Sequence, residues 1–156
     1  MLDYKKLIEA AKNAGLDEVE IVESTSKELE LNFFNGALEN NTVSDITKIS
    51  VKGLLNGKIG AFDIENLDMP YEEVIEVVKR NASANNSNEI SEIFAGSEEY
   101  PVIEEVASDF ENYSIEEKIN LLASMEKEIK AKDPRIAYIP YLQYAETESA
   151  TRITNI

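Results

Sequence analysis

The sequence predicts an α+β fold, with a helix followed by an antiparallel meander of hairpins and then a second helix. Two observations carry this prediction. Apolar residues recur at helical spacing over residues 4–11, and alternating apolar and polar residues follow as far as residue 64. A third observation is that a helix-like segment and strand-like segments return after residue 114. This return predicts the start of a duplicated helix-plus-hairpin unit.

The first helix is expected to begin after Asp3, whose side chain suits an N-cap, and to run to about Ala14. Its apolar residues follow the i, i+3, i+4, i+7 spacing of one helix face, and Gly15 suits the end of a helix. The second helix is expected to start near residues 68–70, with Asp68 as its cap and Pro70 in the first turn.

Between these helices the sequence predicts four or five short strands. Asn35-Gly36 and Asn56-Gly57 are hairpin signals, because both residues tolerate the positive φ of a type I′ turn. Gly53 and Gly60 lie inside strand-like segments, where glycine marks a bulge or a close approach of another backbone. The expected strands cover residues 18–24, 28–34, 37–43, 46–54 and 59–64, with a turn at residues 24–27.

The second half is expected to hold a connection, a third helix and two strands. Residues 85–113 are acidic and irregular, and we expect them to lie on the surface, held by Ile93, Phe94, Val102, Ile103 and Phe110. The third helix starts at a capping box, Ser114 to Glu117, presents an apolar stripe that includes Ile115, Met125 and Ile129, and ends at Asp133-Pro134. Strands at 135–144 and 151–156 follow, with a turn at 146–150.

These elements predict a first α+β repeat at 1–84, an acidic connection at 85–113 and a shortened second repeat at 114–156, together one N-terminal domain. Because the last residues read as a strand, we expect the natural chain to continue. An unprotected final strand is also expected to pair with another copy.

Composition narrows the function. The formal net charge of −16 argues against direct binding to nucleic acid or to an anionic membrane. The sequence contains neither His nor Cys, which removes the commonest general base and the usual zinc ligands. No apolar run approaches the length of a membrane span, and no signal peptide is recognisable, so we expect the cytoplasm.

The candidate site residues favour structural readings. Asp63, Glu65 and Asp68 could bind calcium, but a solvated strand end is the better interpretation. Tyr138, Tyr141 and Tyr144 could form an aromatic binding strip, but core packing is favoured. Ser24, Ser26 and Ser44 lack a base that could activate them. The pairs Glu98-Glu99 and Glu104-Glu105 are interpreted as solvated surface charge. We therefore predict no catalytic, cofactor-binding or metal residue.

Several segments occur in a characteristic order: 17–21, 35–39, 48–63, 133–136 and 151–155. Together they resemble the N-terminal part of the TldD/PmbA family, often described as candidate modulators of DNA gyrase. The segment from Ile93 to Pro101 resembles the PmbA branch, also called TldE, more closely than TldD.

The resemblance implies a zinc metalloprotease system of two related subunits, implicated in peptide-antibiotic maturation and antitoxin degradation. In the family, the TldD-type subunit carries an H-E-x-x-x-H motif in its C-terminal part, which this chain lacks. Zinc is therefore expected only in the catalytic subunit. The resemblance implies here a non-catalytic domain that forms part of a peptide-access cleft and contacts a TldD-like subunit or another copy.

Two alternatives stay open. One is a stand-alone acidic interaction module that mimics nucleic acid, for example toward gyrase, and it predicts carboxylates gathered on one continuous face. The other is an enzyme with a metal site built from Asp63, Glu65 and Asp68.

Overall fold

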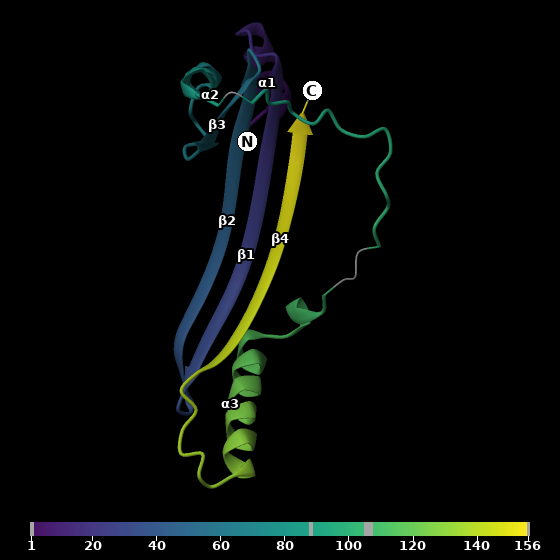
Figure 1. Ribbon diagram of the computed structural model, residues 1–156. Coiled ribbons are helices and arrows are strands. Elements are labelled where there is room, and N and C mark those ends of the chain that lie inside the picture. Colours follow the sequence, from purple (N-terminus) through teal and green to yellow (C-terminus); the bar gives the residue numbers. More distant parts are fainter. Residues whose placement is uncertain (1, 88, 105–107, 156) are drawn as a thin grey trace. The chain divides into compact units, whose positions relative to one another are not determined.

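The computed structural model describes residues 2–87, 89–104 and 108–155. It confirms the α+β class, and its four strands form one sheet in the order β3-β2-β1-β4. The elements are α1 (Tyr4–Asn13), β1 (Glu18–Phe34), β2 (Ala37–Leu55), β3 (Lys58–Ile64), α2 (Tyr71–Ala84), the short 3₁₀ helix η1 (Phe110–Asn112), α3 (Ile115–Lys132) and β4 (Leu142–Asn155) (Figure 1).

Both predicted hairpin turns are confirmed. Asn35 and Gly36 join β1 to β2 with φ of 48° and 83°. Asn56 and Gly57 join β2 to β3 with φ of 52° and 75°. Positive φ at both central residues is the geometry of a type I′ turn, which follows the natural twist of the paired strands.

The predicted breaks within the strands are wrong. β1 continues through Ser24–Lys27, β2 continues through Ser44–Asp45, and β4 continues through Glu146–Ala150. These segments are polar but contain neither Gly nor Pro, and β1 pairs with a neighbour on each side. Paired backbone groups hold such residues extended, so local polarity does not produce a turn here.

β4 also begins later than expected. It starts at Leu142, so Pro140 lies before the strand instead of inside it. A single strand thus follows α3 where two were predicted. Ile156, the last residue of the second predicted strand, lies outside the described residues. Two statements stay predictions. One is that residues 114–156 repeat the first unit, and the other is the division of the chain into 1–84, 85–113 and 114–156.

The chain packs into two compact units made of separate segments. Unit 1 comprises residues 1–25, 47–101 and 150–156, and unit 2 comprises residues 26–46 and 102–149. In unit 1, helices α1 and α2 and the strand segments share one core of buried apolar side chains. Its members are Leu7, Ile8, Ala11, Leu16, Val19, Ile21, Ile49, Val51, Ile64, Val74, Ile75 and Val78.

The two strand glycines of unit 1 mark a close approach, as predicted. Gly53 and Gly60 face each other in the β2–β3 register. A Cβ on Gly60 would lie 2.1 Å from the Val78 carbonyl oxygen and 2.3 Å from the Ala82 backbone nitrogen. Helix α2 therefore packs so closely on β3 that only glycine fits there.

The ends of α1 and α2 test the capping predictions. The Asp3 side chain accepts a hydrogen bond from the Lys6 backbone N–H, which confirms it as the N-cap of α1. The prediction of Asp68 as the cap of α2 is wrong, because Pro70 occupies that position. Proline has no side-chain acceptor, and the Glu73 backbone N–H donates instead to the Pro70 carbonyl oxygen at 3.1 Å.

The connection after α2 is held differently from the prediction. Ile93 is buried in unit 1, and its backbone N–H donates to Glu18 Oε2 at 3.0 Å. Phe94, Val102 and Ile103 are 65%, 97% and 80% exposed, so the expectation that they pin the connection is wrong. The connection is held instead by the hydrogen bond from the Ile93 backbone N–H to Glu18 and by the buried Ile93 side chain.

In unit 2, helix α3 packs on the strand segments through a smaller core. This core contains Leu29, Leu31, Phe33 and Leu122, with Ile119, Ala123, Leu142 and Tyr144 packed against it. The predicted apolar stripe of α3 is only partly buried, because Ile115, Met125 and Ile129 stay exposed. Their place on the buried face is taken by the aliphatic stems of Lys118 and Glu126.

The capping box at the start of α3 is confirmed and gives a first testable prediction. Ser114 Oγ accepts from the Glu117 backbone N–H at 3.2 Å, and Glu117 Oε2 accepts from the Ser114 backbone N–H at 2.7 Å. We expect Ser114→Ala to lower the free energy of unfolding by about 1 kcal/mol, because the Glu117 backbone N–H loses its side-chain acceptor. Urea unfolding measures this, and Ser124→Ala on the same helix, away from its ends, should change it much less.

Candidate functional site

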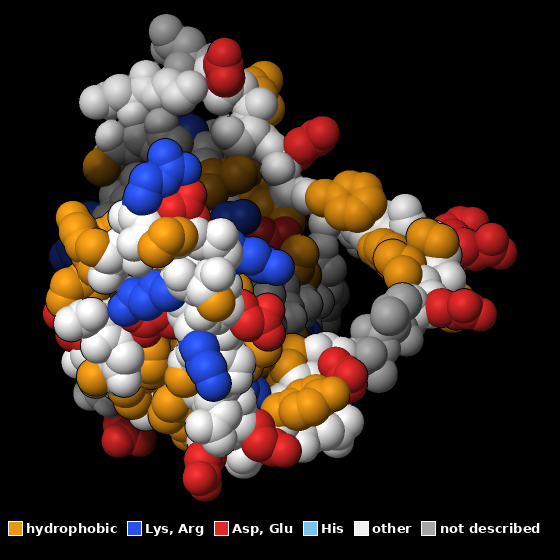
Figure 2. Space-filling view, turned by 90° about the horizontal axis from the view of Figure 1, so that it is seen from below, with side chains coloured by type: hydrophobic (Ala, Val, Ile, Leu, Met, Phe, Trp, Pro, Cys, Tyr) orange, Lys and Arg blue, Asp and Glu red, His pale blue; other side chains and the backbone are white. Residues whose placement is uncertain are grey.

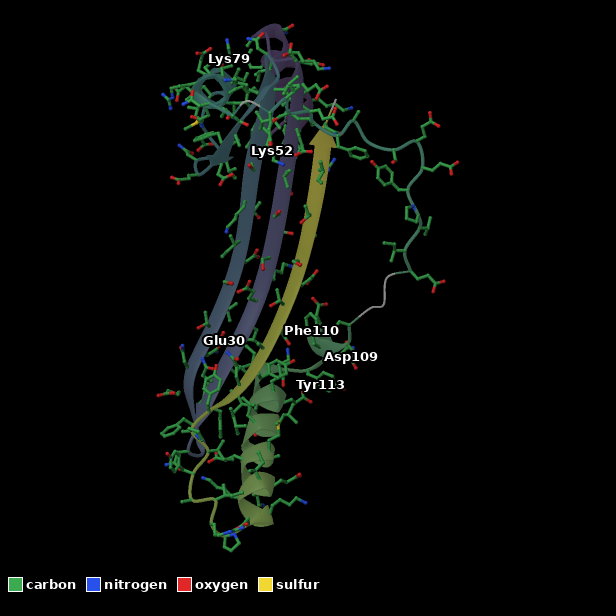
Figure 3. The ribbon with its side chains drawn as sticks, in the orientation of Figure 1. Glu30, Lys52, Lys79, Asp109, Phe110 and Tyr113 are labelled. Atoms are coloured by element: carbon green, nitrogen blue, oxygen red, sulfur yellow. The ribbon has the colours of Figure 1, made fainter. Side chains whose placement is uncertain are left out.

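The candidate site is a pocket of about 520 Å³ in unit 2, between the start of α3, the short helix η1 and strand β4. Asp109, Phe110 and Tyr113 come from η1 and its flanks and lie together at the N-terminal end of α3 (Figure 3). Most of its wall is apolar. The lining residues are Asp109, Phe110, Tyr113, Glu117, Lys118, Asn120, Leu121, Ser124 and Tyr144.

A shielded ion pair lies against this pocket. Lys118 Nζ of α3 donates to Glu146 Oε1 of β4 at 2.9 Å, and the two side chains are only 7% and 16% exposed. The Tyr144 hydroxyl donates to the other carboxylate oxygen, Oε2, at 2.6 Å. One carboxylate therefore fixes both a helix side chain and a strand side chain, which makes this wall of the pocket rigid.

Two aromatic rings also hold the lysine. Lys118 Nζ lies 5.9 Å from the ring centroid of Phe110 and 5.7 Å from that of Tyr144. Both distances allow cation–π attraction, which is stronger where water is partly excluded. With its charge balanced by Glu146, Lys118 acts here mainly as part of the wall.

The pKa values of this group follow from the same contacts. Burial, and then the hydrogen bond to Glu146, raise the pKa of Tyr144 to about 12. Burial would also raise the pKa of Glu146, but hydrogen bonds from Tyr144 and Lys118 outweigh it, so the pKa lies below its ordinary value. Glu146 is therefore ionised and Tyr144 neutral at neutral pH.

A pH prediction follows from these two shifts. The lowered pKa of Glu146 stabilises the fold above pH ~4.5, and this contribution is lost as the pH falls further. The raised pKa of Tyr144 stabilises the fold below pH ~10, and this stabilisation is lost as the pH rises toward 12. Urea midpoints across pH should show both losses. Glu146→Gln should flatten the acid side, whereas Glu128→Gln, on the exposed face of α3, should leave it unchanged.

A second, smaller pocket shares Phe110 with the first and is strongly acidic. Its volume is about 230 Å³. It lies over the unit 2 segments of β1, β2 and β4, and carries five carboxylates against one lysine. Its charged lining residues are Lys27, Glu28, Asp45, Glu111, Glu146 and Glu148. Figure 2 shows, from below, exposed hydrophobic side chains next to acidic ones.

Strand β4 brings an open sheet edge to the first pocket. It is the last strand of the sheet and pairs with β1 on one side, and no strand of the described chain pairs with its other side. In unit 2 this edge covers residues 142–149 and includes Tyr144, which lines the pocket. Unpaired N–H and C=O groups of an edge strand can accept another extended chain.

Comparison with known proteins identifies the group to which this architecture belongs. A family model described as PmbA/TldA metallopeptidase domain 1 matches residues 19–92. Over these residues the chain is similar to the PmbA/TldD family. The match covers most of unit 1 and the unit 2 hairpin of β1 and β2.

Solved structures agree on the fold over almost the whole chain. A candidate modulator of a DNA gyrase from Thermotoga maritima is 28% identical with a TM-score of 0.84, covering 97% of this chain and 34% of its own. TldE from Thermococcus kodakarensis is 18% identical with a TM-score of 0.75, at coverages of 97% and 34%. A candidate modulator of DNA gyrase from Bacteroides thetaiotaomicron is 13% identical with a TM-score of 0.72, at 97% and 35%.

These relatives also set the scale of the chain. It spans about a third of the length of the solved proteins, in line with a first domain. Among curated proteins, none matches its sequence significantly. Within the described residues, no helix is long and apolar enough to cross a bilayer.

The acidic residues singled out in the sequence do not come together in the structure. Asp63, Glu65 and Asp68 are all exposed, and Asp63 and Glu65 line a shallow surface depression beside Lys48. In the described ranges, no three acidic side chains are grouped as metal ligands. Glu98, Glu99 and Glu104 are exposed, and Glu105 lies outside the described residues.

The tyrosine and serine candidates divide. Tyr138 and Tyr141 are 61% and 58% exposed, so their predicted core packing is wrong, because β4 begins only after them. Tyr144 alone packs against a core and reaches the pocket. The serines make local contacts: Ser24 with Thr151, Ser26 with Glu28, while Ser44 lines the acidic pocket.

The sequence reading missed most of the pocket. Tyr113 and Leu121 carry much of its apolar wall, and neither they nor Lys118 were among the predicted site residues. One signal was available: two aromatic residues, Phe110 and Tyr113, directly precede the capping box of α3. Aromatic residues next to the N-terminus of a helix are held in a defined position, so they can form part of a pocket wall.

Proposed function

We propose that this chain is a non-catalytic N-terminal domain of a PmbA/TldD-type metallopeptidase system, which receives an extended peptide and passes it toward the catalytic part. We place it in the PmbA (TldE)-like branch and in the cytoplasm. The chemistry of hydrolysis would lie in a TldD-like subunit that carries the zinc. The absence of His and Cys from the sequence supports a receiving role over a catalytic one.

The observation that carries the proposal is the β4 edge at residues 142–149, unpaired in the described chain and lying beside an apolar pocket. An extended peptide added to this edge would satisfy its backbone hydrogen bonds on β4. Its alternate side chains would then point toward the helix-covered face of the sheet. Backbone recognition of this kind accepts many sequences, which suits a protease that handles unfolded chains.

Backbone-modified peptides test this proposal. We expect a fluorescent peptide of about seven residues, the length of an ordinary strand, to bind the chain in an anisotropy titration. N-methylation of every second amide removes the donors from one peptide edge, and methylation of the other set removes them from the opposite edge. One set should abolish binding and the other should not. Equal affinity of both methylated peptides, or no binding by the unmethylated one, contradicts strand addition.

The place of binding is a separate test. A photo-crosslinking residue in the same peptide should label residues 142–149 of β4. The other outer strand segment of unit 2, residues 37–46 of β2, serves as the internal comparison. Labelling confined to β2 contradicts the assignment to β4.

A further inference from the structure

We propose that the pocket formed by Phe110, Tyr113, Leu121 and Tyr144 selects the peptide: it takes an aromatic or large aliphatic side chain flanked by lysine or arginine. This inference rests on the proposed function and adds to it the chemical class of the substrate. The pocket lies in unit 2, and all its lining residues come from that unit.

The apolar part of the site is open to solvent and unfilled by side chains of the described residues. Tyr113 and Leu121 are 52% and 50% exposed where they line the pocket. Its volume of about 520 Å³ exceeds what one large side chain needs. Burying a phenylalanine or leucine against these surfaces removes apolar area from water on both sides, which favours binding.

The charged part of the site is acidic, with more carboxylates than lysines among its lining residues. Lys118 is neutralised by Glu146, whereas Asp109 and Glu117 at the pocket are exposed. Phe110 also lines the acidic pocket, where Glu28, Asp45, Glu111 and Glu148 outnumber the single Lys27. A peptide cation next to the inserted side chain would meet this negative surface, whereas a peptide carboxylate would be repelled.

The walls are held in place before any peptide arrives. Tyr144 is fixed by its 2.6 Å hydrogen bond to Glu146, and Lys118 by its ion pair and by the two rings beside it. Residues with few free rotamers lose little entropy on binding, so more of the burial free energy appears as affinity. A rigid apolar wall beside an open strand edge is the usual arrangement for side-chain selection in strand addition.

Three peptides of the same length separate the contributions. The reference has a central phenylalanine flanked by lysines; the second replaces phenylalanine by alanine, and the third replaces both lysines by glutamates. We expect the alanine peptide to bind about tenfold more weakly, equivalent to ~1.4 kcal/mol. The glutamate peptide should bind more weakly still at low salt, and the difference should shrink as salt screens the charges.

Matched variants locate the effect in the pocket. Leu121→Ser should bring the phenylalanine peptide to the affinity of the alanine peptide, while Met125→Ser, an equally exposed apolar residue of α3 that does not line the pocket, should not. Asp109→Asn combined with Glu111→Gln should weaken the preference for lysine, and Glu128→Gln should not. All five substitutions affect exposed side chains, and unchanged circular dichroism verifies folding.

The outcomes distinguish this inference from the function on which it rests. If all three peptides bind with one affinity, strand addition stands and the pocket does not select. If Leu121→Ser and Met125→Ser act alike, the selecting surface lies elsewhere and the inference is overturned. If no peptide binds, the proposed function itself fails.

Discussion

Gly60→Ala is expected to lower the free energy of unfolding by about 3 kcal/mol or more, a large share of the stability of an ordinary domain. The added methyl group would lie 2.1 Å from the Val78 carbonyl oxygen and 2.3 Å from the Ala82 nitrogen. Both atoms belong to the backbone of α2, so no side-chain rotation relieves the clash. The helix has to move off β3 and open the core that Val74 and Val78 share with the sheet.

Gly53→Ala, at the paired position on β2, gives a graded comparison. Its methyl group would meet only the ends of side chains, at 2.7 Å from Val78 Cγ1 and 2.8 Å from Leu16 Cδ1. Side-chain ends can rotate away, so we expect a smaller loss of about 1–2 kcal/mol. Urea unfolding followed by circular dichroism measures both, and Ala61→Ser on the exposed side of β3 should stay within about 0.5 kcal/mol of the parent. A Gly60→Ala protein as stable as Ala61→Ser would contradict the close packing.

These glycines show what the sequence alone can predict. Asn35-Gly36 and Asn56-Gly57 specify their turns because few dipeptides tolerate positive φ twice, so a local property determines the structure. The capping box at Ser114 and the cap at Asp3 are local in the same sense. Gly53 and Gly60 indicated that something approaches the hairpin, but not that α2 does.

The errors have a common physical cause, which is pairing between segments far apart in the sequence. Ser24 and Thr25 read as a turn, yet their hydroxyl groups contact Thr151 and the Ala150 carbonyl oxygen of β4 at 3.5 Å. No short window of sequence contains such a partner. The same reasoning applies to the pocket: Lys118 looks like a surface residue until β4 places Glu146 beside it.

The ion pair of Lys118 and Glu146 yields the second large prediction. Lys118→Ala should lower the free energy of unfolding by about 2–3 kcal/mol, because it leaves the shielded carboxylate of Glu146 with only the Tyr144 hydroxyl as a side-chain partner. The loss should be smaller than the ~3–5 kcal/mol of a fully buried pair, since the acidic pocket gives Glu146 some access to water. Lys127→Ala, at an exposed lysine of α3, is the matched control.

A double-mutant cycle separates the pair from its surroundings. Lys118→Met keeps the aliphatic stem that packs beside Phe110 and Tyr144, and Glu146→Gln keeps the shape of the carboxylate and an acceptor for Tyr144. Each single substitution leaves one partner without its counter-charge, so the double variant should be more stable than the sum of the two losses predicts. Strictly additive losses would show that the pair contributes no coupling. The rigid wall of the pocket would then have to come from packing alone, and Lys118→Met would leave peptide selection intact.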